Sequence, residues 1–275
     1  MAIATPSPPA DLRTYRVRAH NIAADSDNKI HDDTVARRYG FGGGLVPGIA
    51  VYGYLTHSVV ERCGEAWLER GAATTRFISP CYEGEVIEVH ATAGSGATFD
   101  LLAQRADGTA CARGTAGWRA PDLAQPDISE YPVAPLPDER PPASAQSLAP
   151  GRVLGTFSLH LDEQRAAEFL DGIRDDLALY RGPSGIAHPA LLLACANWFL
   201  AHNVVLGPWI HVASEVTHFG IARYGDTVSL RGRVAEQFER KGHEFVVLDL
   251  LVVADRDRII QHLRHTAIYR PRAAS

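Results

Sequence analysis

Hydrophobic and polar positions follow the same order twice along this chain of 275 residues. In each half, a strand-like segment and a connection precede a long apolar stretch, and four further strand-like segments follow it. The apolar stretches run from Leu45 to Trp67 and from His188 to Val205, and each is long enough for several turns of helix. This order predicts two related modules.

Short turns separate the four strand-like segments of each half. The segments cover residues 74–80, 86–92, 99–105 and 110–118, and then residues 213–220, 227–234, 245–254 and 259–270. Strands joined by short turns form an antiparallel sheet, and a helix with few polar positions is buried against such a sheet. We therefore predict an α+β fold with two antiparallel sheets, each wrapped around a long central helix. The other half is expected to cover the open edge of each sheet.

Changes in composition mark the boundaries of the two modules. Residues 1–12 are rich in Pro and Ala and are predicted to be unstructured, and residues 120–150 are dense in Pro, Ala and Ser. The second stretch is typical of an extended linker with polyproline II character. The predicted domains are residues 13–119 and residues 151–273, on either side of this linker.

Composition also excludes several classes of protein. The net charge is −5 and no long basic run occurs, so nucleic acid is not an expected partner. The four cysteines show neither C-x-x-C spacing nor the spacing of a zinc site. Four histidines alternate with apolar residues on the predicted strands: His211, His218, His262 and His265. No metal site is therefore predicted. Sparse thiols fit a cytoplasmic location. Neither a signal peptide nor a transmembrane segment is expected, because no suitable apolar run occurs.

Residues 23–53 carry the most informative side chains. His31 lies on a loop rich in aspartate, Asp32 and Asp33 can cap a short helix over residues 35–39, and Pro47-Gly48 opens the first long helix. The start of a helix offers free N–H groups and the positive end of the dipole. Such donors suit a thioester carbonyl that gains negative charge, and a nearby imidazole suits proton transfer.

The stretch Ser26-Asp27-Asn28-Lys29-Ile30-His31, with Ala36 five residues later, resembles the motif Gly-Asp-x-Asn-Pro-(Leu/Ile)-His-x5-Ala of MaoC-like hydratases. Gly40-Phe41 and Val46-Pro47-Gly48 match the layout of that family. The resemblance implies a double hot-dog fold that reversibly adds water to a trans-2-enoyl thioester of CoA or acyl-carrier protein. It implies no cofactor, and it leaves open a monomeric pseudo-dimer or a homodimer.

The resemblance assigns roles to individual positions. His31 falls on the catalytic histidine and Asn28 on the motif asparagine, whereas the catalytic aspartate falls on Ser26, which cannot act as a carboxylate. Asp25 or Asp27 could replace it from a shifted loop. The candidate catalytic residues are therefore His31, Asp27, Asp25, Asn28 and Ser26, and the candidate substrate-binding residues are Gly48, Pro47, Gly44, Tyr52 and His188.

Each candidate also has an ordinary structural explanation. His31 could hydrogen-bond to neighbouring acids, the aspartates and Asn28 could cap turns, and Gly48 could allow close packing of the helix entry. Tyr52 could pack in the core, and His188 could be a satisfied buried histidine. The functional hypotheses are a hydratase or dehydratase, a thioesterase that uses a carboxylate, a non-catalytic acyl-thioester binding protein, and a cyclase or decarboxylase on the same scaffold. The position of His31 and of the carboxylates relative to the thioester distinguishes the first two.

Overall fold

The computed structural model describes residues 11–272, and both halves contain the predicted order of elements. Residues 1–10, most of the predicted unstructured segment, lie outside this range. The first half comprises β1 (Tyr15–Arg18), η1 (Lys29–His31), α1 (Asp33–Arg38), α2 (Gly48–Cys63), α3 (Glu65–Arg70), β2 (Gly71–Phe77), β3 (Val86–Ala93), β4 (Thr98–Arg105) and β5 (Ala110–Trp118). After η2 (Ile128–Glu130), the second half comprises β6 (Val153–His160), α4 (Glu163–Ile173), η3 (Ala178–Tyr180), α5 (Pro189–Asn203), β7 (Ile210–His218), β8 (Thr227–Arg240), β9 (His243–Ala254) and β10 (Arg258–Arg270).

The strands form one antiparallel sheet in the order β1-β3-β4-β5-β2-β7-β10-β9-β8-β6. The first five strands come from the N-terminal half and the last five from the C-terminal half, and β2 pairs with β7 where the halves meet, with Thr74 opposite Glu215. The predicted fold class is confirmed. We also predicted that each half covers the open sheet edge of the other half. This prediction is confirmed, because β2 of the first half pairs with β7 of the second half and the two sheets form one continuous sheet.

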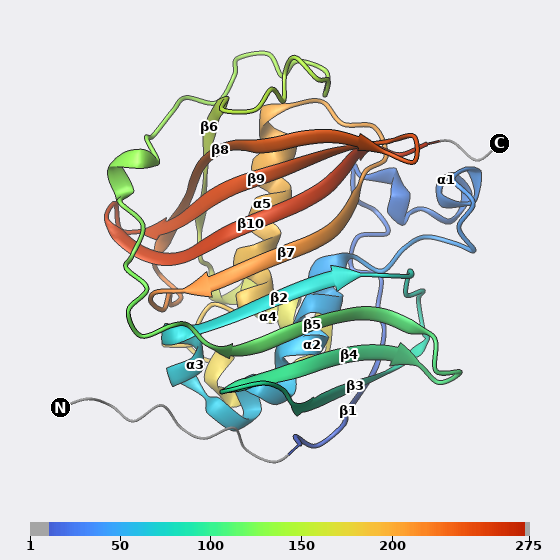
Figure 1. The fold of residues 1–275 in the computed structure, drawn as a ribbon, viewed down its shortest axis with the longest axis vertical. Helices are drawn as coiled ribbons and strands as arrows, with labels where there is room; N and C mark the ends of the chain where they lie inside the picture. The colour runs from blue at the N-terminus through green and yellow to red at the C-terminus, as the bar shows by residue number, and fades with distance from the viewer. Residues whose placement is uncertain (1–10, 273–275) are drawn as a thin grey trace.

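The two central helices lie behind this sheet, on one side of it (Figure 1). Residues on every side of α2, from Ile49 to Val60, are buried, and so are residues 189–196, the apolar first turns of α5. A helix that is hydrophobic all round must be enclosed, and here α2 and α5 contact each other beneath the sheet. The first apolar stretch is divided in two because Gly64, at φ 60°, ends α2 before α3 begins.

The linker between the halves packs on the opposite face of the sheet. The side chain of Tyr131 is buried against Leu251 and Val253, whose neighbours along β9 face the helices instead. The Tyr131 hydroxyl also donates a hydrogen bond to Asp249, at 3.0 Å. The linker is therefore held against the C-terminal half along part of its length.

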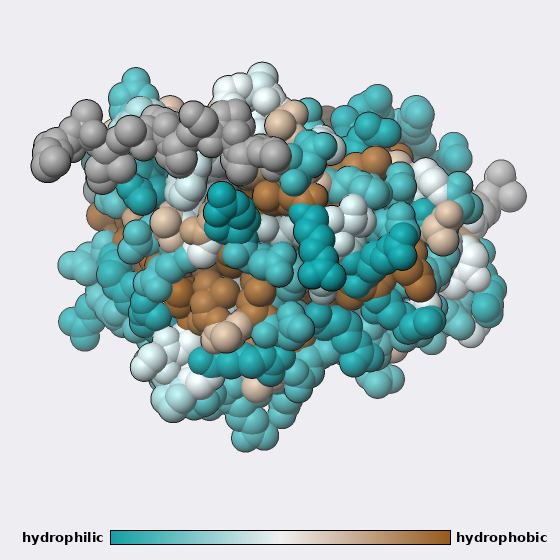
Figure 2. Space-filling model, turned by 90° about the horizontal axis from the view of Figure 1, so that it is seen from below, coloured by the Kyte–Doolittle hydropathy of each residue, from teal (hydrophilic) through white to brown (hydrophobic). Residues whose placement is uncertain are grey.

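Polar side chains cover most of the molecular end at which β1 and β3 lie, with apolar residues visible in patches between them (Figure 2). Within residues 11–272, no helix combines the length and the apolar character needed to cross a membrane.

Candidate active site

Two cavities meet between the halves. The larger, of about 910 Å³, is lined by the loop that carries His31 and by residues of β6, α4 and α5. The smaller, of about 220 Å³, lies beside the start of α2, the end of β2 and the start of β7. Five residues line both cavities and so mark their junction: Asn28, His31, Pro47, Asn197 and Trp209. Two predicted catalytic residues are thus at this junction.

The imidazole of His31 is held in one tautomer. Its Nδ1 lies 2.6 Å from the carbonyl oxygen of Leu45, which can only accept, so Nδ1 carries the hydrogen and Nε2 keeps its lone pair. Burial lowers the pKa of His31, although the hydrogen bond to Leu45 opposes the shift. The ring is therefore a neutral base at pH 7. Among the described residues its ring nitrogens contact Asn28 and Leu45 and no acid, so the alternative of a loop histidine paired with aspartates does not apply.

Asn28 ties the His31 loop to the C-terminal half. Its Nδ2 donates to the carbonyl of Trp209 at 3.0 Å, and its Oδ1 accepts from the N–H of Trp209 at 3.1 Å. The same side chain caps η1 and lies 3.4 Å from Nε2 of His31. Asn28 therefore has both the capping role and a place beside the candidate base.

Of the three other candidate catalytic residues, two line the larger cavity only and one lines neither cavity. Ser26 and the exposed Asp27 line the larger cavity only, and the Ser26 hydroxyl donates to the carbonyl of Asn28 at 3.4 Å. Asp25 is exposed and lines neither cavity, so the structure does not place it as a substitute base. Among the described residues no carboxylate lines both cavities, which leaves His31 as the titratable group at the junction.

The predicted substrate-binding residues separate into two groups. Pro47 lines both cavities, and Gly48 lines the smaller one. Gly48 is also the first residue of α2, and the first N–H groups of a helix have no carbonyl group of a preceding turn as a partner. Gly44, another predicted substrate-binding residue, lines neither cavity. A Cβ there would lie 2.1 Å from the carbonyl oxygen of His31, so Gly44 serves the close packing of the loop. Tyr52 is fully buried in the core and also lines neither cavity, as its packing alternative predicts.

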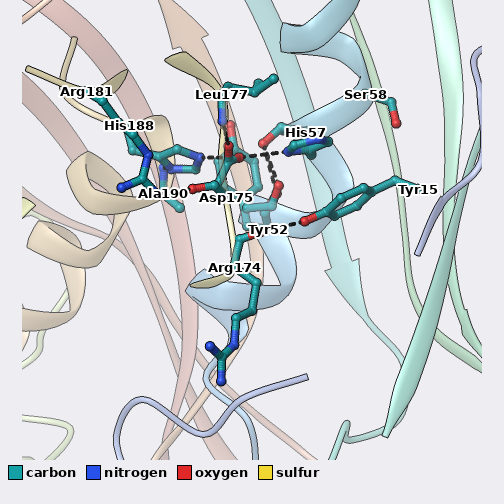
Figure 3. Close-up of polar contacts among 12 residues, drawn as sticks. Tyr15, Tyr52, His57, Ser58, Arg174, Asp175, Leu177, Arg181, His188 and Ala190 are labelled. Atoms are coloured by element: carbon teal, nitrogen blue, oxygen red, sulfur yellow. Dashed lines mark hydrogen bonds and ion pairs between the residues drawn. The ribbon is translucent and has the colours of Figure 1, made fainter. Parts of the chain in front are cut away.

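His188, also predicted to bind substrate, belongs to a closed hydrogen-bonded network at the corresponding entry of α5. Figure 3 shows Asp175 between the rings of His57 and His188. Its Oδ2 lies 3.0 Å from Nδ1 of His57 and 3.2 Å from Nε2 of His188, while Nδ1 of His188 accepts from the N–H of Ala190 and caps α5. All three side chains are buried, and none lines either cavity.

Hydrogen bonds explain this cluster fully. Burial alone would raise the pKa of Asp175, but the hydrogen bonds from His188 and His57 outweigh it and hold the pKa below its usual value. Ligand atoms of His57, Asp175 and Asp176 come within 4.8 Å of one another, as in a metal site. However, the oxygens of Asp175 already accept from both histidines and from the N–H of Leu177, so the cluster is satisfied by the protein itself.

Sequence reasoning missed two residues of the cavity walls. Asn197 is on α5 and lines both cavities, and an amide in the middle of an apolar helix was a signal that could have identified it. His211 was assigned to a sheet face, which is correct, but that face forms a wall of the smaller cavity. Only the packing of β7 against the start of α2 identifies this wall.

No protein-family model and no curated protein matches this sequence. Solved structures do match the fold. A protein assigned as a MaoC domain dehydratase from Chloroflexus aurantiacus has 11% identity and a TM-score of 0.66, with 98% of this chain and 96% of that chain covered. A conserved hypothetical protein of Mycobacterium tuberculosis, with a double hot-dog fold, has 16% identity and a TM-score of 0.64, with 94% and 96% covered. A protein assigned as a thioesterase from Novosphingobium aromaticivorans has 13% identity and a TM-score of 0.57, with 95% and 99% covered. The predicted double hot-dog fold is therefore confirmed.

Proposed function

We propose that this protein is a hydratase or dehydratase that reversibly adds water to a trans-2-enoyl thioester of CoA or acyl-carrier protein. One observation carries the proposal. His31 is a neutral imidazole with Nδ1–H donated to Leu45, and it lines the junction of two cavities beside the start of α2. A base and a set of helix N–H donors are the two components that this reaction needs.

The chemistry follows from these positions. Nε2 of His31 takes a proton from water, and the water oxygen forms a bond to C3 of the enoyl group. The electron pair of the C2=C3 bond moves towards the thioester carbonyl, where the first N–H groups of α2, from Gly48 onward, stabilise the negative charge. The imidazolium then returns its proton to C2, which leaves a 3-hydroxyacyl thioester and a neutral His31. In the reverse direction the same groups remove water.

The position of the carboxylates favours hydration over hydrolysis. A thioesterase of this fold would need a carboxylate to activate water, and Asp27 is the motif aspartate that lines the larger cavity. Hydrolysis stays the second candidate for that reason. Asp27 is exposed and does not line the smaller cavity, whereas His31 lines both.

The test is the hydration of crotonyl-CoA and of a longer trans-2-enoyl-CoA, followed by the loss of enoyl absorbance, with release of free CoA measured in parallel. His31→Ala should lower kcat by about 10²- to 10⁴-fold, the usual contribution of a general acid–base group, while its circular dichroism spectrum stays that of wild type. CoA release without hydration would support the thioesterase. Tight binding without either reaction would support a binding protein.

A further inference from the structure

We infer that the larger cavity holds the chain of a long-chain acyl thioester, and that the carrier arm reaches the site through the smaller cavity. The inference rests on the proposed function for the reacting groups, and it goes further by naming the class of acyl group and its direction in the protein. Three observations support it: the order of Gly48 and His31 along the cavities, the distribution of hydrophobic and charged residues in the walls, and the two volumes.

The order of the reacting groups gives the direction of the substrate. Gly48, at the end of α2 that stabilises the thioester carbonyl, lines the smaller cavity only, whereas His31, which acts at C2 and C3, lines both cavities. A substrate that meets both groups has its carbonyl on the side of the smaller cavity and C3 at the junction. The carbons beyond C3 therefore continue into the larger cavity. The smaller cavity leaves a route for a narrow carrier arm, because Ile78 in its wall is 52% exposed.

The inner wall of the larger cavity is hydrophobic. Every fully buried residue of its described wall has a hydrophobic side chain. Those of the C-terminal half include Leu161, Ala166, Leu191, Ala194 and Val204. Each methylene group of a ligand that is buried against such a wall strengthens binding by about fourfold. An alkyl chain therefore gains affinity with every carbon that enters this cavity.

The charges around the larger cavity do not suit the phosphate groups of a carrier. The Asp, Glu and Arg residues of its described wall are all exposed and so lie at its mouth: Asp27, Arg140, Asp162, Arg165 and Glu168. Carboxylates thus outnumber guanidinium groups, and Arg140 already donates to the carbonyl of Ala201 at 2.7 Å. A mouth without an excess of positive charge does not attract phosphate. This agrees with a carrier that enters from the other side.

The volume of the larger cavity indicates the length of the chain. A cavity of about 150 Å³ holds a benzene molecule, so 910 Å³ admits roughly 30 non-hydrogen atoms and 220 Å³ roughly six to nine. A butyryl chain would leave most of the larger cavity unfilled. The hydrophobic wall also extends to the surface, because Trp198 and Val205 line this cavity and are 38% and 49% exposed. The acyl class is therefore an unbranched chain of roughly 12 to 18 carbons.

The experiment is a calorimetric titration of the wild-type protein with butyryl-CoA, octanoyl-CoA and dodecanoyl-CoA, each below its micelle concentration. Saturated esters cannot be hydrated, so the result does not depend on catalysis. We expect affinity to rise with chain length, and dodecanoyl-CoA to bind at least about thirtyfold more tightly than butyryl-CoA, because its additional methylene groups enter the larger cavity. A smaller difference, or no binding of any ester, would overturn the inference.

Two substitutions on α5 fill the larger cavity and so test which cavity holds the chain. Ala194 is buried and Ala201 is half-buried, and both line the larger cavity only. Ala194→Phe and Ala201→Phe should each weaken the binding of dodecanoyl-CoA by at least about tenfold and that of butyryl-CoA by less than about threefold, because the short chain extends little beyond the junction. Circular dichroism checks folding, and Ala201→Phe decides the question if Ala194→Phe does not fold.

Ala66→Phe is the matched control. Ala66 is half-buried on α3 and lines neither cavity, so this variant should bind all three esters as wild type does. Unchanged binding of dodecanoyl-CoA in a folded cavity-filling variant, or an equal loss for the short and the long ester, would overturn the inference. The predicted preference without any hydration of enoyl-CoA would instead refute the proposed function alone.

Discussion

Replacing Asp175 by asparagine should destabilise the protein without touching the candidate active site. The carboxylate accepts three hydrogen bonds, from His57, His188 and the N–H of Leu177. Nε2 of His188 must carry a hydrogen, because its Nδ1 already accepts from Ala190. An asparagine in either orientation therefore points its NH₂ group at another donor. A hydrogen bond to a buried charged group contributes about 1.5–3 kcal/mol, and we expect a loss of about that size.

Urea unfolding followed by circular dichroism measures this loss as a fall in the midpoint at constant m-value. Asp171→Asn is the control, because the side chain of Asp171 is 70% exposed and pairs with Arg181 at 3.0 Å, an arrangement worth at most about 1 kcal/mol. A loss below about 1 kcal/mol in Asp175→Asn would refute the assignment of the network as a stabilising one.

The same network predicts how stability depends on pH. The pKa of Asp175 is lower in the folded protein than in the unfolded chain, where it is about 3.9. Its contribution is therefore complete above the unfolded pKa and disappears as the pH falls through the folded one. The difference in unfolding free energy between wild type and Asp175→Asn should be constant from about pH 7 to pH 5 and should shrink below about pH 4.

Three further predictions concern the His31 loop. The acid limb of kcat/KM for enoyl-CoA hydration should have its midpoint below 6.5, because burial lowers the pKa of the base; a midpoint above that value would contradict the role of His31. Ser26→Asp should raise kcat by at least about tenfold if a second proton acceptor is the missing component, and no gain in a folded variant would count against the motif resemblance. Gly44→Ala should displace the backbone of His31, lowering kcat and costing about 1–3 kcal/mol of stability. Wild-type rates in Gly44→Ala would show that the loop tolerates the shift.

The pattern along the chain determined the elements and their order. The turns before residues 110–118 and after residues 245–254 helped to define strands that β5 and β9 match closely, because a turn is specified by residues that are neighbours in the chain. The long apolar stretches gave α2 and α5, since a helix without a polar face must be enclosed. The motif placed His31 near the entry of the first long helix, and in the structure His31 lines a cavity together with Pro47 and Gly48 at the start of α2.

Tertiary structure alone decided which side chains share the site. Asn28 and Trp209 are 181 residues apart, and the pairing of β2 with β7 and the packing of α2 against α5 bring their halves together. The same packing brings Asn197 and His211 to the wall of the smaller cavity and encloses His188 with Asp175 and His57. Periodicity specifies which face of an element is buried, but it contains no information about which distant element that face meets.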